Sequence, residues 1–94
     1  MFKTNEYFDG KVKSIAFQTK TLPATVGVMA PGEYVFNTTD KEKMTVVSGA
    51  LTIRLADSKE SQSYVSGESF DVDANSSFDV SVAIETAYLC LYGN

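Results

Sequence analysis

Apolar and polar side chains alternate over several short segments of this chain, and turn-forming residues separate those segments. Alternation runs through residues 51–56, 70–73 and 78–83. A period of two is typical of a β-strand with one buried and one solvent-facing side. The turn signals are Asp9-Gly10, Pro31-Gly32, Ser48-Gly49, Ser66-Gly67 and residues 73–77. No segment has a helical period, so we expect an all-β fold without substantial helix, either a sandwich or a small barrel of jelly-roll type. Ser48-Gly49 predicts a tight hairpin.

The length of the chain, 94 residues, fits one domain over residues 1–94. A chain of this size buries only about 60–65% of its unfolded surface. Yet 44% of the residues are hydrophobic, and the single cysteine, Cys90, rules out an intramolecular disulfide. Residues 87–92 are apolar on both faces of the expected strand, which therefore needs cover on both sides. One face can meet the interior and the other a partner chain.

The charge balance is acidic, with 8 basic against 12 acidic residues, and no basic stripe is present. Binding to a nucleic-acid polymer is therefore not expected. No apolar stretch approaches the roughly 20 residues of a membrane span, and residues 1–10 lack the apolar centre of a signal peptide. We expect a cytoplasmic protein that does not bind a membrane.

Two glycine-anchored patterns have a characteristic spacing. In the first, Gly32 is followed after five intervening residues by Thr38, then by Asp40, by Glu42 and, after six intervening residues, by Gly49. This frame resembles the first motif of the cupin family, where histidines usually stand at Thr38 and Asp40 and the glutamate joins a metal site.

The second pattern runs from Gly67 through Asp73 and Asn75 to Phe78. In cupins the last metal-binding histidine usually stands at the place of Phe78. Since the chain contains no histidine, a histidine-based metal site is impossible, and we expect neither a metal nor an organic cofactor. An all-oxygen site at Asp40 and Glu42 is the alternative. A resemblance in fold alone does not identify the function.

Longer blocks are similar to the pyrimidine/purine nucleoside phosphorylase family, which consists of short, single-domain, metal-free cupins. The blocks are residues 5–8, 10–15, 26–29, 32–34, 42–51 and 87–90. They span nearly the whole chain in the family's order. The departures are Asp73 and Asn75, where the family tends to have a proline-containing turn. The resemblance implies a pentosyltransferase that uses inorganic phosphate as co-substrate, cleaves purine and pyrimidine nucleosides to free base and pentose 1-phosphate, and forms a homodimer.

Cleavage of this bond builds positive charge on the sugar, so the site needs a group that stabilises a cation. Glu42 is the catalytic candidate if it occupies the inward position of the cupin ligand. The alternative is a surface glutamate near the end of a loop. Alternation would place substrate-binding side chains beside it. The candidates are Tyr34, Phe36, Thr38, Met44, Ser48, Phe70, Phe78 and Tyr88, of which the aromatic ones can stack on a base or simply pack in the core.

Lys11, Lys13 and Ser14 are the candidates for phosphate binding, since lysine supplies a positive charge and serine a neutral donor. The alternative is that both lysines face solvent. Thr45, Tyr88 and Tyr92 are further hydrogen-bond donors that the pattern does not rank.

Two other classes of function remain open on the residues alone. The chain can be a non-catalytic cupin that binds a nucleoside or a sugar-like molecule, or a structural dimer without a small ligand. Base release that depends on phosphate distinguishes the enzyme from both.

Overall fold

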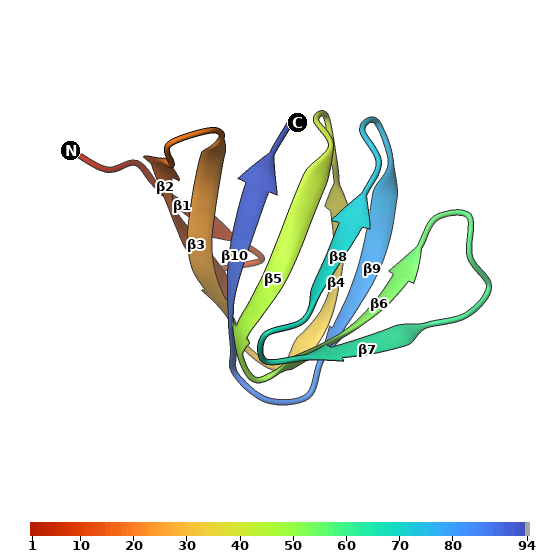
Figure 1. Ribbon diagram of the computed structural model, residues 1–94. Helices are drawn as coiled ribbons and strands as arrows, with labels where there is room; N and C mark the ends of the chain where they lie inside the picture. The colour runs from red at the N-terminus through yellow and green to blue at the C-terminus, as the bar shows by residue number, and fades with distance from the viewer. Residues whose placement is uncertain (94) are drawn as a thin grey trace.

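The computed structural model describes residues 1–93 as two antiparallel sheets that face each other (Figure 1). The strands are β1 (Thr4–Tyr7), β2 (Val12–Gln18), β3 (Pro23–Met29), β4 (Gly32–Asn37), β5 (Glu42–Ser48), β6 (Ala50–Leu55), β7 (Gln62–Val65), β8 (Ser69–Val72), β9 (Ser77–Val82) and β10 (Thr86–Tyr92). The larger sheet has the order β1-β2-β3-β10-β5-β8, and the smaller one β4-β9-β6-β7. No helix occurs in this part of the chain, so the all-β prediction is confirmed.

The apolar alternation places one hydrophobic core between the sheets. Val12, Met29, Met44 and Val46 come from the larger sheet, and Leu51, Phe78 and Val80 belong to the smaller one; all are almost fully buried. The inward positions expected in β8 and β9 are confirmed. Leu55, at the end of β6, is an exception and is 38% exposed.

The hairpin predicted at Ser48-Gly49 is wrong. Strands β5 and β6 follow each other directly but belong to different sheets, so Gly49 forms a corner rather than a hairpin turn. Gly49 has a φ of 101°, and a Cβ there would lie against the Thr86 hydroxyl and 2.9 Å from the Glu85 carbonyl oxygen. Only glycine fits this close approach to β10 at a positive φ. A turn signal predicts a change of direction and does not identify the pairing partner.

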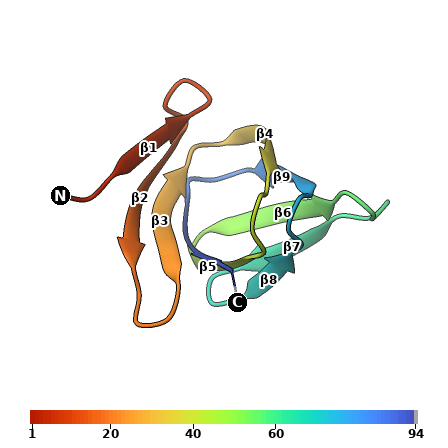
Figure 2. The same cartoon turned by 90° about the horizontal axis from the view of Figure 1, so that it is seen from above.

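The two sheets do not enclose the core equally on all sides. Seen from above, β1 and β2 lie to one side of the ring formed by the other strands (Figure 2). Strand β1 pairs only with β2 and is poorly buried along its length. The turn that follows it, residues 8–11, reaches toward β4 of the smaller sheet, and the cavity described below lies there.

Candidate functional site

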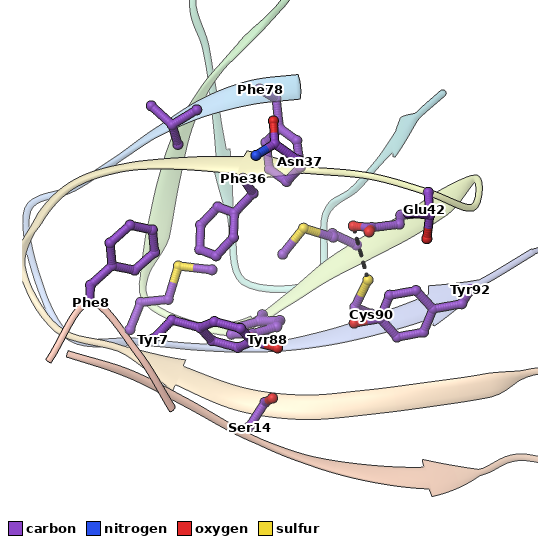
Figure 3. A pocket seen from close by; sticks show the side chains of 14 residues that line it. Tyr7, Phe8, Ser14, Phe36, Asn37, Glu42, Phe78, Tyr88, Cys90 and Tyr92 are labelled. Carbon is purple, nitrogen blue, oxygen red and sulfur yellow. Dashed lines mark hydrogen bonds between the residues drawn. The ribbon is translucent and has the colours of Figure 1, made fainter. Parts of the chain in front are cut away.

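A cavity of about 420 Å³ opens between the two sheets, a volume typical of small-molecule sites. Its lining combines polar with aromatic side chains (Figure 3). The residues are Tyr7, Phe8, Ser14, Met29, Val35, Phe36, Asn37, Thr39, Glu42, Met44, Phe78, Tyr88, Cys90 and Tyr92.

The inner face of the larger sheet forms the polar wall of the cavity. Strand pairing places Ser14, Gly27 and Tyr88 in one row across β2, β3 and β10. A Cβ on Gly27 would lie 2.7 Å from the Tyr88 hydroxyl and 2.9 Å from Ser14 Cβ. The glycine therefore provides the space in which the Tyr88 hydroxyl reaches the neighbourhood of Ser14. Burial raises the pKa of Tyr88 to about 12, so this phenol stays protonated at neutral pH.

Of the described residues that line the cavity, Glu42 alone carries a carboxylate. It begins β5 and pairs with Tyr92 of β10. The thiol of Cys90 donates a hydrogen bond to Glu42 Oε1 at 3.5 Å, and the Tyr92 hydroxyl lies 2.9 Å from Thr25 Oγ1. Burial raises the pKa of Glu42 above its ordinary value, the charge of Asp40 raises it further, and the Cys90 hydrogen bond acts in the opposite direction. The inward orientation expected for Glu42 is thus what the structure has.

The opposite wall is aromatic. Phe36 of β4 and Phe78 of β9 stack with ring centroids 5.6 Å apart and an interplanar angle of 26°. Phe8, from the turn after β1, stands edge-on to Phe36 at 5.5 Å. The cavity therefore offers a flat apolar surface on one side and hydrogen-bonding groups on the other, which fits a ligand with a planar ring and a polyhydroxylated part.

The substrate-binding candidates from the sequence divide into two groups. Phe36, Met44, Phe78 and Tyr88 line the cavity together with Glu42, whereas Tyr34, Thr38, Ser48 and Phe70 do not. Tyr34 is buried beside the cavity, and its hydroxyl donates a hydrogen bond to the Ala30 carbonyl at 2.6 Å. Phe70 packs on Tyr64 at the other end of the core, with ring centroids 4.7 Å apart.

Ser48 and Thr38 differ most clearly from their expected places. Ser48 was predicted to face inward, but it is exposed, because the register between β5 and β10 shifts by one residue between Val46 and Ser48. Such a bulge ends the strict alternation of side chains. Thr38 is buried and joins two loops, since its hydroxyl donates to the Asp73 carbonyl at 2.6 Å and accepts from the Ser76 amide at 2.9 Å.

The phosphate candidates do not converge on one site, and the pleat of β2 separates Lys13 from Ser14. Ser14 is buried and lines the cavity, while Lys11 and Lys13 are exposed and lie outside its lining. Neighbouring positions of a strand point to opposite faces, which explains why Lys13 and Ser14 do not converge. Within residues 1–93 no lysine or arginine lines this cavity. Of the remaining donors, Thr45 binds the Ser69 hydroxyl at 2.7 Å in an exposed position.

The cupin metal positions do not fit a metal ion here. The Thr38 hydroxyl is hydrogen-bonded to the loop of residues 73–76, Asp40 is exposed, and Phe78 packs into the core. In the described part of the chain, no three histidine, cysteine, aspartate or glutamate side chains are grouped so that they can hold a metal.

Several lining residues were missed from the sequence, chiefly Tyr7, Phe8, Asn37 and Thr39. Asn37 and Thr39 flank Thr38, so the sequence correctly indicated that this segment lies at the cavity but predicted Thr38 as the lining residue instead of its two neighbours. The Asp9-Gly10 signal located the turn that contains Phe8, but no pattern indicates that this turn covers a cavity.

Comparison with known proteins finds relatives that match nearly the full length of the chain. Residues 2–92 match the family model described as pyrimidine/purine nucleoside phosphorylase. A protein of Alcanivorax borkumensis with that name is 63% identical over 93 residues, and the match covers 99% of this chain and 99% of the relative. A crystal structure of a protein of unknown function from Vibrio parahaemolyticus superposes with a TM-score of 0.95 at 50% identity, covering 98% of both chains. The fold extends to a putative ethanolamine utilization protein of Salmonella typhimurium, with a TM-score of 0.77 at 14% identity, covering 99% of this chain and 94% of that one. On the full-length match to the family model and to its relatives, the chain belongs to the pyrimidine/purine nucleoside phosphorylase family.

Proposed function

We propose that this protein is a phosphate-dependent nucleoside phosphorylase that accepts purine and pyrimidine nucleosides and releases the free base and a pentose 1-phosphate. The family match over residues 2–92 supports this activity. The observation that carries it is the two-sided cavity, in which one carboxylate, Glu42, lies across from a wall of stacked rings.

The reaction needs no covalent bond to the protein. A phosphate oxygen forms the new bond to the anomeric carbon while the bond from that carbon to the base nitrogen breaks, and its electron pair leaves with the base. Positive charge develops on the sugar during this exchange. Glu42 stabilises that charge as an ionised carboxylate, and its half-buried position strengthens the interaction relative to water.

The phosphate is held by neutral donors in this proposal. Ser14 and Tyr88 form the polar corner of the cavity, and Lys11 and Lys13 lie outside it. Hydroxyl donors bind an anion without the desolvation cost of a buried lysine. The reaction also proceeds without a metal or cofactor, which is supported by the absence of histidine from the sequence.

Two copies of the chain form the working unit. The outer face of the larger sheet carries the apolar side chains of Ile15, Val26, Val28 and Val47, each more than 40% exposed. Leu89 lies in the same cross-strand row as Ile15 and Val26. A patch over four adjacent strands is typical of a surface that another protein covers, and a second copy is the partner implied by the family resemblance.

We further propose a cytoplasmic location, where nucleosides and phosphate are available together. No helix in the described residues is long and apolar enough to cross a membrane.

The test follows free base and pentose 1-phosphate by chromatography after purified, chelator-treated protein is incubated with adenosine or uridine, with and without phosphate. We expect base only when phosphate is present. Glu42→Gln should lower turnover by orders of magnitude, whereas Glu85→Gln, the same change in an exposed loop, should have no effect. Binding without base release would instead identify a non-catalytic nucleoside-binding cupin.

A further inference from the structure

The turn between β1 and β2 has an unusual backbone for the residues that it contains. Phe8 has a φ of 53° and Asp9 a φ of 58°, and the Gly10 amide donates a hydrogen bond to the Tyr7 carbonyl at 3.1 Å. Two central residues at positive φ make a turn of type I′, for which asparagine and glycine are preferred. A bulky residue such as phenylalanine is a conformational outlier at this position.

The ring of Phe8 connects this turn to the smaller sheet. Its centroid lies 4.9 Å from that of Tyr34 and 5.5 Å from that of Phe36, both on β4. Phe36 in turn stacks on Phe78 of β9. Three rings from three different parts of the chain thus line one side of the cavity, with Phe8 at its outer end (Figure 3).

Packing in the core does not explain this placement. Phe8 is 41% exposed, whereas Phe78 is 2% exposed. A half-exposed ring gains only part of the free energy of burial, and the left-handed backbone opposes even that gain. Outliers of this kind concentrate at binding and catalytic sites, because function maintains what folding disfavours.

We propose that Phe8 is the base-stacking, specificity-determining side chain of the cavity, and that its ligand is the planar purine or pyrimidine ring of a nucleoside. The nature of this ligand rests on the proposed function. Stacking requires only a π-face, so one ring accepts both classes of base. The larger face of a purine overlaps more of the ring, so purine nucleosides depend on Phe8 more than pyrimidine nucleosides do.

The first experiment measures KM for adenosine, uridine and phosphate in Phe8→Leu and Phe8→Tyr. Leucine keeps an apolar side chain but cannot stack, so KM for adenosine should rise roughly 5- to 150-fold, and KM for uridine should rise less. KM for phosphate should stay unchanged, and tyrosine should retain wild-type values. Phe2→Leu is the matched control, because Phe2 is 72% exposed and outside the cavity. Unchanged KM for both nucleosides in Phe8→Leu would overturn the inference while leaving the phosphorylase activity intact.

A second variant separates binding from packing. Asparagine suits the left-handed position, so Phe8→Asn should keep or raise the melting temperature while nucleoside binding is lost. A lower melting temperature with unchanged KM would show that Phe8 only packs.

Ligand-induced thermal stabilisation by adenosine alone, without turnover, tests the inference independently of catalysis. If the protein is not a phosphorylase, wild type should still be stabilised and Phe8→Leu should not. Equal stabilisation of both proteins, or none in wild type, would refute the role of Phe8.

Discussion

Gly27 provides a sharp test of how the polar wall of the cavity is built. It lies in the middle of β3 with an ordinary backbone, so alanine would cause no φ strain at this position. A Cβ there would stand 2.6 Å from the Lys13 carbonyl oxygen and 2.7 Å from the Tyr88 hydroxyl. Both are closer than real Cβ contacts allow, and the carbonyl belongs to the neighbouring strand β2, which cannot move cheaply. Gly27→Ala must therefore displace Tyr88 and widen the pairing of β2 with β3.

The magnitude follows from three terms. Overpacking costs about 1–3 kcal/mol, and a weakened polar interaction of the Tyr88 hydroxyl with Ser14 costs about 0.5–1.5 kcal/mol. The lower entropy of the unfolded alanine chain returns about 0.4–1 kcal/mol. The net loss is about 2 kcal/mol, which for a domain of this size lowers the melting temperature by about 8–16 °C.

Thermal unfolding of Gly27→Ala, Tyr88→Phe and the double variant measures this effect. Removal of the hydroxyl relieves one of the two contacts, so the double variant should be more stable than additivity predicts, by about 0.5 kcal/mol or more. Activity should fall in Gly27→Ala, because Tyr88 lines the cavity. A melting temperature within about 2 °C of wild type, or strict additivity, would refute this account of the wall.

Four further predictions concern the site and its surroundings. Burial raises the pKa of Glu42 above its ordinary value of 4.5, so its ionised form costs stability once the pH rises through the folded-state pKa. Glu42→Gln should therefore have a higher melting temperature than wild type at neutral pH, and this difference in melting temperature should vanish in acid. Equal melting temperatures of the two proteins from pH 4 to 8 would contradict this. In steady-state kinetics with varied phosphate, Ser14→Ala should raise KM for phosphate at least several-fold, whereas Lys13→Ala should change it by no more than about twofold. A larger increase of KM in Lys13→Ala than in Ser14→Ala would show that the lysine binds phosphate. Because Cys90 is buried and burial raises the pKa of its thiol, a thiol reagent should label it only after denaturation. Rapid labelling of the native protein would show that the reagent reaches Cys90 through the cavity. If the outer face of the larger sheet forms the proposed dimer interface, Val28→Lys should give a monomer in light scattering while the protein stays folded. A dimer mass that is the same in wild type and variant would contradict this position of the interface.

Local patterns were sufficient for much of the fold. The alternation in residues 70–73 and 78–83 correctly predicted which side chains face the core, because the pleat of a strand is set by the strand itself. The resemblance of the glycine frame around Glu42 to the cupin motif indicated an inward carboxylate as one of two alternatives, and the structure has Glu42 in the cavity lining. The blocks along the chain identified the family.

Pairing between distant segments could not be derived in this way. The corner at Gly49 depends on the approach of β10, and the exposure of Ser48 depends on a bulge against the same strand. Both result from contacts with residues about forty positions away, which a turn signal or a period of two does not describe.

The sequence by itself determined the all-β class, the absence of a histidine metal site and the family, and it left Glu42 open between an inward and a surface position. Only the tertiary structure decided which side chains share the cavity. It decides that the inner face of β2 is the one that carries Ser14 and not Lys13, and it brings Phe8 from an N-terminal turn onto the rings of β4. The physical reason is that alternation and turns act between near neighbours, whereas a binding site is the meeting point of two sheets whose packing depends on the whole chain.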